Sequence, residues 1–378
     1  MISKKKINFN LIKKIIREKG FELKKKKTFF NFKELKGLYY TISCSFVLVF
    51  IFFLIPLSVN IKQNINLNKL TVDNNSNINF QKVLDGKSLE NNDQVDKDLD
   101  LKNLFEDVFS LNENVQTDAV RLNASTIKEL FKDTDYNLEN IRKTKLVKPV
   151  KLSLLPKEMK YIQSTKEKKN LFLEIILPLV IEENNRIKLD RKKLFTILNK
   201  NNNSKKEISW LNKKFKQYGV VKKDLATLKI RMDEVPVSLA LAQAAKETGW
   251  GTSRFAIEGN ALFGQWTWSG EGIKPAGINS ENAKHKVMKF KVLKASVRAY
   301  QRNLNTHGSY KKFRSERASM RDNEEELDSL LLADYLDKYA ATGKEYTKIL
   351  KQIIKQNNLK DFDKVKLLPT SLQLKSII

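Results

Sequence analysis

One long uncharged stretch constrains what this chain can fold into more than any other feature. Residues 37–61 contain no charged side chain, and their centre, from Phe46 to Ile55, is apolar without interruption. About 20 residues of helix are enough to cross the hydrocarbon core of a bilayer. A buried helix in a soluble domain is the alternative, but one so apolar and unpatterned is rare. We therefore expect a single transmembrane helix over residues 37–61.

The charge on the two sides of this segment predicts its orientation. Residues 1–36 hold 13 basic and 3 acidic side chains, whereas residues 62–140 hold 9 basic and 15 acidic ones. Positive charge collects on the cytoplasmic side of membrane spans. A cleaved signal peptide is disfavoured because the basic leader is long and no small-residue cleavage motif follows the apolar run. The sequence predicts a single-pass inner-membrane protein with a cytoplasmic N-terminus and a periplasmic C-terminal part.

Composition argues against several kinds of site. The chain has one cysteine, Cys44, and two histidines, His285 and His307, so we expect neither a disulfide framework nor a zinc centre. No metal and no organic cofactor is implied. The net charge of +28 suggests an anionic partner. Basic and acidic residues are intermixed and no nucleic-acid-binding motif is recognised, so an anionic polymer of the cell envelope is the simpler partner.

Beyond the membrane segment, composition separates a polar region from a helical one. Residues 62–123 are acidic and polar, which is typical of a stalk or a disordered linker. Seven of the 13 glycines and three of the four tryptophans fall between Gly249 and Gly277, which indicates a loop-rich, aromatic-lined surface. Helical periodicity and one alternating stretch predict helices and a strand in the C-terminal part. The helices are expected over residues 171–181, 194–198, 210–218, 236–247, 296–304, 324–335 and 344–357, and the strand or hairpin arm over 287–293.

Glu247 is the residue whose surroundings point most clearly to chemistry. In the predicted helix 236–247 it shares a face with Ala240, Gln243 and Ala244 rather than with a ladder of salt bridges. It also lies in the last turn, where the helix dipole disfavours a negative charge. Partial burial and the dipole both favour the protonated carboxyl and raise its pKa. A carboxyl that is neutral near pH 7 is what acid-catalysed cleavage of a glycosidic bond requires, although helix position alone would also suit an ordinary surface glutamate.

Sequence blocks around and after Glu247 resemble a known family. Lys246–Ser253 and Asn260–Gly264 resemble the E-S-x-W-G and N-N-L-F-G motifs of glycoside hydrolase family 73, the bacterial N-acetylglucosaminidase domain. The chain departs from these motifs at Thr248, where the family has serine, and at Ala261, where it has a second asparagine. Neither change removes the proton donor. Further blocks resemble the Bax-type proteins of that group: Ser125–Asn140, Leu154–Pro156, Lys168–Val180, Tyr300–His307, Phe313–Arg314 and Tyr339–Tyr346.

The resemblance implies a fold and, together with the charge and apolar content of the N-terminal part, a domain order. The fold would be α+β and mostly helical, a lysozyme-like glucosaminidase domain with a small β-lobe and a glycan-binding cleft between the lobes. It would be preceded by the one transmembrane helix. The domain order would be a basic cytoplasmic segment (1–36), a transmembrane anchor (37–61), an acidic stalk (62–123), a Bax-like lead-in (124–165), a glucosaminidase catalytic domain (166–360) and a tail (361–378).

The resemblance places the catalytic acid at Glu247 and leaves the second carboxylate open. In the family this carboxylate belongs to the β-lobe and is not fixed by a tight motif. Glu258, Glu271 and Glu281 are the candidates, and Glu281 is favoured because it follows Glu247 by 34 residues, about where the family's second acid falls. Carboxyl groups about 6.5–9.5 Å apart would indicate inversion, and about 5–5.5 Å retention. A route through the substrate's own N-acetyl group is a third alternative.

Other residues are expected to surround the acid. Tyr339 matches the first tyrosine of the family's Y-A-T-x block, and it would position the acetamido group or the attacking water. Aromatic rings in an extended segment would stack on sugar faces. The residues expected to bind substrate or shape its cleft are Asn260, Phe263, Trp266, Trp268 and Glu271. Structural roles are assigned to Trp250, Tyr346 and His307.

The sequence therefore predicts a membrane-anchored glycoside hydrolase that cleaves the glycan strands of peptidoglycan at N-acetylglucosamine. A catalytically weak protein of cell-wall binding or assembly is the alternative, and a nucleic-acid-binding membrane protein is a third. The presence of Glu247 favours the enzyme. Glucosaminidase and muramidase specificity are not separated by these patterns, and neither are the oligomeric state and the protein partners.

Overall fold

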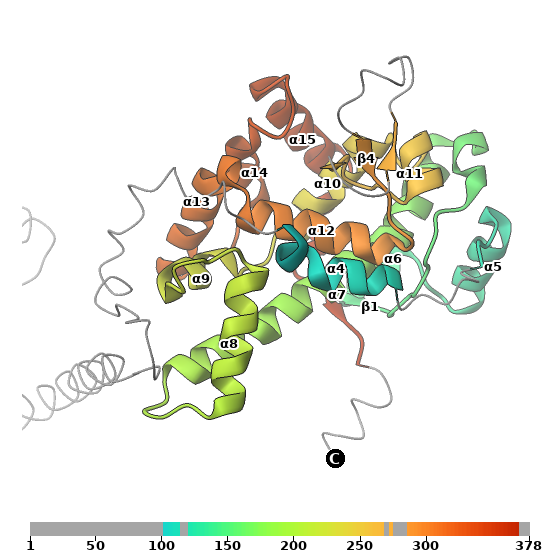
Figure 1. Ribbon diagram of the computed structural model, residues 1–378. Coiled ribbons are helices and arrows are strands. Elements are labelled where there is room, and N and C mark those ends of the chain that lie inside the picture. Colours follow the sequence, from blue (N-terminus) through green and yellow to red (C-terminus); the bar gives the residue numbers. More distant parts are fainter. Residues whose placement is uncertain (1–100, 114–119, 268–271, 275–285, 370–378) are drawn as a thin grey trace, which may run out of the picture. The chain divides into compact units, whose positions relative to one another are not determined.

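The computed structural model describes residues 101–113, 120–267, 272–274 and 286–369 (Figure 1). The predicted transmembrane segment, residues 37–61, lies outside these ranges. Within them, no helix combines the length and the apolar character that crossing a bilayer would need.

Helices make up most of the described chain. The α-helices are α4 (Leu101–Glu113), α5 (Ala124–Asp133), α6 (Leu138–Thr144), α7 (Thr165–Leu198), α8 (Lys205–Gln217), α9 (Leu225–Arg231), α10 (Val237–Thr248), α11 (Arg254–Gly259), α12 (Leu293–Thr306), α13 (Lys311–Asp322), α14 (Ser329–Ala333) and α15 (Lys344–Gln356). Short 3-10 helices are η2 (Lys157–Tyr161), η3 (Gly308–Tyr310), η4 (Asp334–Leu336) and η5 (Leu359–Phe362). The mostly helical fold that the sequence predicted is confirmed.

Two small sheets complete the fold. β1 (Leu146–Val147) pairs in parallel with β5 (Lys366–Leu367). β4 (Lys286–Met288) is the centre of a three-stranded antiparallel sheet, between β2 (Trp266–Thr267) and β3 (Gly272–Ile273). The strand expected over residues 287–293 is therefore present but shorter, because α12 already begins at Leu293.

α10 lies at the centre of the main core. All its residues from Val237 to Ala245 are buried, and it packs against α7, α15, α14 and η5. Its alanines have small side chains, which lets these neighbours approach closely. Gly249 ends the helix in the left-handed conformation at φ +56°. The helix therefore carries Glu247, in its last turn, to a fixed place beside the elements that surround it.

The N-terminus of α10 is capped from a distant part of the chain. Pro236 precedes the helix and offers no side-chain cap. Asp363 accepts hydrogen bonds from the backbone N–H and the hydroxyl of Ser238, each at 2.8 Å. Burial raises the pKa of Asp363 to about 6, against the hydrogen bonds from Ser238 that lower it. Asp363 falls in the segment expected to be a tail, so part of residues 361–378 belongs to the folded core.

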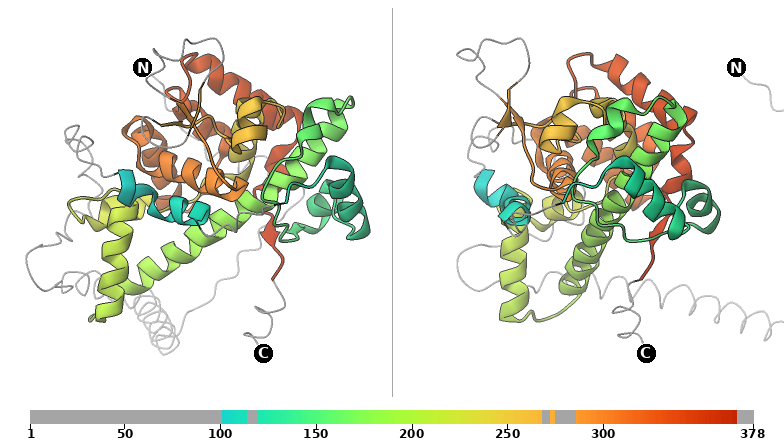
Figure 2. Two further views of the ribbon diagram at one scale, coloured as in Figure 1. Left: turned by 45° about the vertical axis from the view of Figure 1, so that its right-hand side comes forward. Right: turned by 90° about the vertical axis from the view of Figure 1, so that its right-hand side faces the viewer.

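α7 is one helix of 34 residues, whereas the sequence suggested separate helices over residues 171–181 and 194–198 (Figure 2). Pro178 lies inside it and is buried among apolar neighbours. The polar residues between the two apolar runs do not interrupt the helix, because they are paired. Arg186 contacts Glu183, which is buried, and Asp190 at 3.3 Å. Burial of both flanking apolar runs explains why the helix tolerates the proline.

The C-terminal part of α7 forms a second, smaller core with α8 and α9. Leu194, Leu198, Leu211 and Phe215 are among its buried residues. In Figure 1, α8 and the C-terminal end of α7 extend away from the elements around α10. The separate core supports this extension without any contribution from the residues near Glu247.

α4 falls within the range predicted as a stalk, residues 62–123, yet it packs on α12 and α8. Val108 of α4 is fully buried with Phe290 and Ala295. Arg302 of α12 holds the same helix, since it donates to the carbonyl of Leu104 at 2.6 Å and contacts the carboxylate of Asp107 at 3.0 Å. The folded part of the chain thus begins earlier than composition indicated.

Candidate active site

The Glu247 carboxyl lies against the loop that follows α11. A Cβ atom added to Gly264 would stand 3.2 Å from Oε2 of Glu247, so the two residues are in direct contact. Gly264 has a φ of +61°, which a residue with a side chain rarely adopts. The glycine of the N-A-L-F-G block therefore serves two purposes: it permits the turn and leaves room for the carboxyl.

The hydroxyl of Tyr346, from the first turn of α15, hydrogen-bonds to the Glu247 carboxyl. Its ring stacks on that of Tyr339, with centroids 5.4 Å apart and planes 7° from parallel. Tyr310 approaches Tyr339 at 5.9 Å. On the α12 side, Tyr300 stacks on Phe263 with centroids 3.8 Å apart. Glu247 is thus surrounded by rigid aromatic rings, and of these tyrosines Tyr346 is the one that hydrogen-bonds to it.

Burial raises the pKa of Glu247 above its ordinary value. The hydrogen bond from Tyr346 and the charge of Lys246 act in the opposite direction but do not cancel the effect. Burial also raises the pKa of Tyr310, to about 12, so that phenol stays neutral. The sequence attributed the shift to burial together with the helix dipole, and in the structure burial is the largest cause. Burial thus favours the protonated form of the Glu247 carboxyl, which lies near phenol groups whose pKa values burial also raises.

The raised pKa has a consequence for stability. The folded chain binds a proton at Glu247 more tightly than the unfolded chain, so protonation of Glu247 stabilises the fold. This contribution to the free energy of unfolding is present at low pH and is lost as the pH rises through the folded-state pKa. Replacing Glu247 with glutamine, which mimics the protonated form, should therefore raise the free energy of unfolding at about pH 8 and change it little at about pH 4. Urea unfolding of the two proteins at both pH values checks this. Equal stability of the two proteins at about pH 8 would contradict it.

The framework of the site contains three of the residues that the sequence singled out. Tyr339 is half-buried, and its hydroxyl donates to the backbone carbonyl of Phe263 at 2.8 Å. Phe263 is 1% exposed. Asn260 is buried and ends α11 at φ +50°, with its side-chain amide donating to the carbonyl of Phe290 at 2.9 Å. Phe263 therefore lies in the wall of the site, which Tyr339 links to α15, whereas the side chain of Asn260 joins the end of α11 to Phe290.

Four predicted site residues cannot be placed by their side chains. Trp268, Glu271 and Glu281 lie outside the described residues. Trp266 begins β2, where its backbone pairs with Val287, but its side chain is not described. The second carboxylate at Glu281 thus stays a prediction.

The remaining candidates have structural contacts. Glu258, the described alternative for the second acid, lies on α11 with 58% of its side chain exposed, 4.0 Å from Arg254. His307 is exposed and accepts the backbone N–H of Ser309 at 3.2 Å. Trp250 meets the ring of Phe172 edge-on at 5.9 Å and packs on the main core. The structural roles that the sequence assigned to His307 and Trp250 agree with these contacts.

Thr248 uses its hydroxyl as a serine could. The hydroxyl donates to the carbonyl of Ala244 at 2.6 Å and accepts the backbone N–H of Gly251 at 2.9 Å. It thereby joins the last turn of α10 to the loop beyond. The departure from the family motif at this position keeps the hydrogen bonds that hold Glu247 in its place.

Sequence reasoning missed most of the polar residues around Glu247. Gln243, Tyr300 and Tyr310 were not proposed for the site, and Tyr346 was assigned to the core. Tyr346 is indeed buried, but its hydroxyl reaches the carboxyl. The signal for Gln243 was present: it is a polar residue four positions before Glu247 in a run of alanine and leucine.

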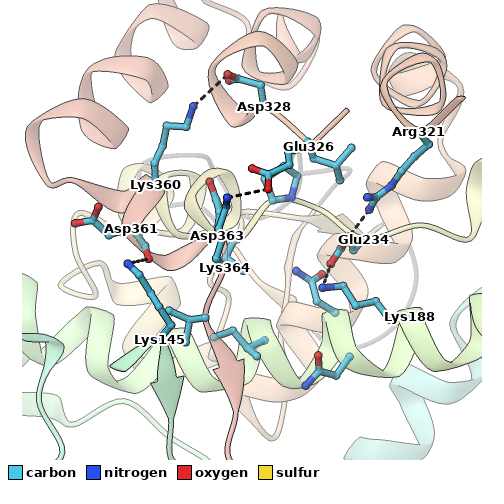
Figure 3. Close-up of a pocket in the computed structure, with 17 residues that line it drawn as sticks. Lys145, Lys188, Glu234, Arg321, Glu326, Asp328, Lys360, Asp361, Asp363 and Lys364 are labelled. Atoms are coloured by element: carbon cyan, nitrogen blue, oxygen red, sulfur yellow. Dashed lines mark hydrogen bonds and ion pairs between the residues drawn. The ribbon is translucent and has the colours of Figure 1, made fainter. Parts of the chain in front are cut away.

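A cavity of about 430 Å³ lies at the other end of α10 from Glu247 (Figure 3). Its charged side chains pair with one another across the opening: Lys188 with Glu234 at 2.8 Å, and Lys360 with Asp328 at 3.1 Å. No predicted site residue lines it. We assign it to the support of the fold.

The described part of the chain also contains no group of three or more His, Cys, Asp or Glu side chains arranged to hold a metal ion.

Comparison with known proteins identifies the family of the chain. Residues 223–359, which include Glu247, Gly264 and Tyr346, match the family model of glucosaminidases, described as mannosyl-glycoprotein endo-beta-N-acetylglucosaminidase. Protein Bax of Escherichia coli strain K12 is 33% identical over 213 residues, which make up 55% of this chain and 76% of that protein. No solved structure gives a significant match. The chain belongs to the Bax family of proteins that carry a glucosaminidase domain.

Proposed function

We propose that this protein is a membrane-anchored glycoside hydrolase that cleaves peptidoglycan glycan strands at N-acetylglucosamine, with Glu247 as the general acid. The observation that carries the proposal is the Glu247 carboxyl, with its burial-raised pKa, inside the segment that matches the glucosaminidase model. A neutral carboxylic acid at this place can protonate a glycosidic oxygen as the bond to it breaks.

The surrounding residues suit the proton transfer. Once Glu247 has given its proton to the departing sugar oxygen, it becomes a carboxylate in a part-buried place. The Tyr346 hydroxyl then donates a hydrogen bond to a full negative charge, and such bonds are stronger than those between neutral groups. The contact with Gly264 limits how far the carboxyl can move between the two states.

The rest of the mechanism follows from the predicted residues. Glu281 is proposed to activate the water or to act as the nucleophile, and Glu271 is the next candidate. Trp266 and Trp268 are proposed to stack on sugar rings, and Tyr339 to position the acetamido group or the water. Inverting, retaining and substrate-assisted routes all begin with the same proton from Glu247.

The substrate is proposed from the predicted topology. The family model is named for activity on mannosyl-glycoproteins. In this chain, the anchor at residues 37–61 would place the glucosaminidase domain in the periplasm, where wall glycan lies. The basic charge of the chain suits attraction to an anionic envelope polymer. Protease accessibility of the domain in spheroplasts tests this topology, because a cytoplasmic domain would be protected.

Mass spectrometry of digestion products tests the activity. Purified sacculi and a high-mannose glycoprotein are each incubated with the full chain, and the new reducing ends are identified. Reducing N-acetylglucosamine from sacculi supports the proposal. Reducing N-acetylmuramic acid would make the protein a muramidase, release from the glycoprotein alone would change the substrate class, and no release from either would favour a binding or assembly role.

A further inference from the structure

Tyr346, whose hydroxyl lowers the pKa of Glu247 as a hydrogen-bond donor, stands at the end of a series of hydrogen bonds. Gln243, one turn before Glu247 on α10, is fully buried. Its Oε1 accepts the hydroxyl of Tyr300 at 2.7 Å, and its Nε2 donates to the hydroxyl oxygen of Tyr346 at 3.2 Å. The series therefore runs from Tyr300 on α12, through Gln243, to Tyr346 on α15 and then to Glu247.

The direction of each hydrogen bond follows from the one before it. An amide NH₂ group can only donate, so the Tyr346 oxygen acts as an acceptor toward Gln243. The single hydrogen of the Tyr346 hydroxyl is then free to be donated to Glu247. If the Gln243 amide were turned over, Tyr346 would donate to Gln243 and could only accept from Glu247. The amide orientation thus decides whether Tyr346 supports a carboxylate or a protonated carboxyl.

Tyr300 contacts the oxygen side of this amide in the orientation that the structure shows. Its ring is fully buried and stacks on Phe263 at 3.8 Å, with planes 9° from parallel, so its hydroxyl has a fixed position. The donation from this hydroxyl to Oε1 holds the oxygen side of the Gln243 amide toward α12. The NH₂ side then faces α15 and Tyr346.

We propose that Gln243 and Tyr300 are positioning residues that fix the Tyr346 hydroxyl as a hydrogen-bond donor to Glu247. With this direction fixed, the proton of the neutral acid lies on the carboxyl oxygen that Tyr346 does not contact and is presented to the substrate. After the proton has left, the same hydroxyl stabilises the carboxylate. No atom of the series has to turn between the two states.

The other groups around Glu247 do not perform this task. Tyr339 donates to the carbonyl of Phe263, and Tyr310 hydrogen-bonds to Asn303. Lys246, next to Glu247, contributes its charge. On the other elements packed on α10, Asp363 lies at the opposite end of the helix, bonded to Ser238. Tyr346 is the phenol whose direction the series controls.

Replacing Gln243 with methionine tests the proposal, because methionine has a similar length and volume but neither donates nor accepts a comparable hydrogen bond. The Tyr346 hydrogen is then no longer directed at Glu247, and the ionised carboxylate is less stabilised. The alkaline limb of the pH profile of kcat/KM reports the acid in the free enzyme, and it should move up by about one pH unit. The variant Tyr300→Phe should move it in the same direction by a smaller amount, because the amide becomes free to turn.

Tyr136→Phe is the matched control, since Tyr136 is also buried and donates to a carbonyl, that of Glu174 at 2.8 Å, away from Glu247. It should lower stability without moving the pH profile. If Gln243→Met and Tyr300→Phe keep the alkaline limb of the wild type, the proposal is wrong.

The measurement of kcat/KM rests on the proposed function, because it requires that the protein cleaves glycan. A second measurement, which needs no substrate, tests the role of Gln243 separately from the proposed function. The pH dependence of the stability difference between Glu247 and its glutamine variant reports the same proton without any substrate. In the Gln243→Met background, the stability difference between glutamate and glutamine at position 247 should keep growing with pH up to a value about one pH unit higher than in the wild-type background. A wild type that cleaves no glycan would overturn the proposed function alone. An unchanged pH dependence in both backgrounds would overturn the role of Gln243.

Discussion

Replacing Glu247 with glutamine is expected to lower kcat for glycan cleavage by about 10²- to 10⁴-fold, the contribution typical of a positioned general acid. Glutamine has nearly the same shape and can still accept the hydrogen bond from Tyr346, but it has no acidic proton to give. Because the amide fills the same place, KM should change little. Initial rates on purified sacculi, with folding checked by circular dichroism, measure the effect.

Glu345→Gln provides a matched control for this substitution. Glu345 precedes Tyr346 on α15, but its side chain is 62% exposed and contacts Lys348 at 3.5 Å on the surface. The same loss of one carboxylate there should leave kcat unchanged. If Glu247→Gln retains the turnover of the wild type, the assignment of the general acid is wrong whichever substrate is cleaved.

Replacing Gly264 with alanine is expected to reduce both stability and turnover. At φ +61° an alanine is strained by roughly 1–2 kcal/mol. Its Cβ would stand 3.2 Å from Oε2 of Glu247, closer than ordinary contact, so the carboxyl has to shift. Small misplacements of a catalytic group are costly, and we expect kcat to fall by about 10- to 100-fold. Urea unfolding and rate measurements on the same preparation separate the two effects.

The variant Gly219→Ala serves as a control for Gly264→Ala, because it introduces similar backbone strain without a contact with Glu247. Gly219 has a φ of +63° and follows α8, in the smaller core that contains no residue of the site. Alanine there should cost similar stability and leave turnover as it was. If the two variants lose the same activity, the contact between Gly264 and Glu247 has no catalytic consequence.

The elements that sequence reasoning predicted well are those whose signals are local. α10 begins after Pro236 and ends at Gly249 because each residue fixes the backbone at its own position. The run of small and apolar residues between them specifies a buried helix. The position of Glu247 in its last turn, and the resulting burial of the carboxyl, could therefore be foreseen.

The elements that were missed depend on contacts between distant residues. The polar stretch in the middle of α7 suggested a break, yet Glu183 is buried and paired with Arg186 and with Arg298 of α12, at 3.1 Å from the latter. The composition of α4 predicted a linker. In the structure, one of its acidic residues, Asp107, pairs with Arg302, which lies nearly two hundred positions away in the sequence. Local periodicity contains no information about such pairs.

The residues of the candidate site also divide into those with local signals and those that depend on distant contacts. Glu247 could be found because the helix itself gives it an unusual position, but Tyr346 resembles any buried tyrosine in the sequence. Its role comes from Gln243 and Tyr300, which approach it from two other helices. The range predicted for one helix, residues 324–335, also proved to be only a short α14 followed by η4, since the core requires little more than Leu332 and Leu336 there.

The central claim is that the Glu247 carboxyl keeps its proton to a higher pH than an ordinary glutamate. The most direct measurement is a ¹³C NMR titration of the full chain labelled at the glutamate carboxyl carbons, with the Glu247 signal identified by its loss in the glutamine variant. We predict a midpoint clearly above the value of about 4.3 that is usual for an exposed glutamate. A midpoint at or below that value would leave no neutral acid to protonate a sugar oxygen and would contradict the mechanism.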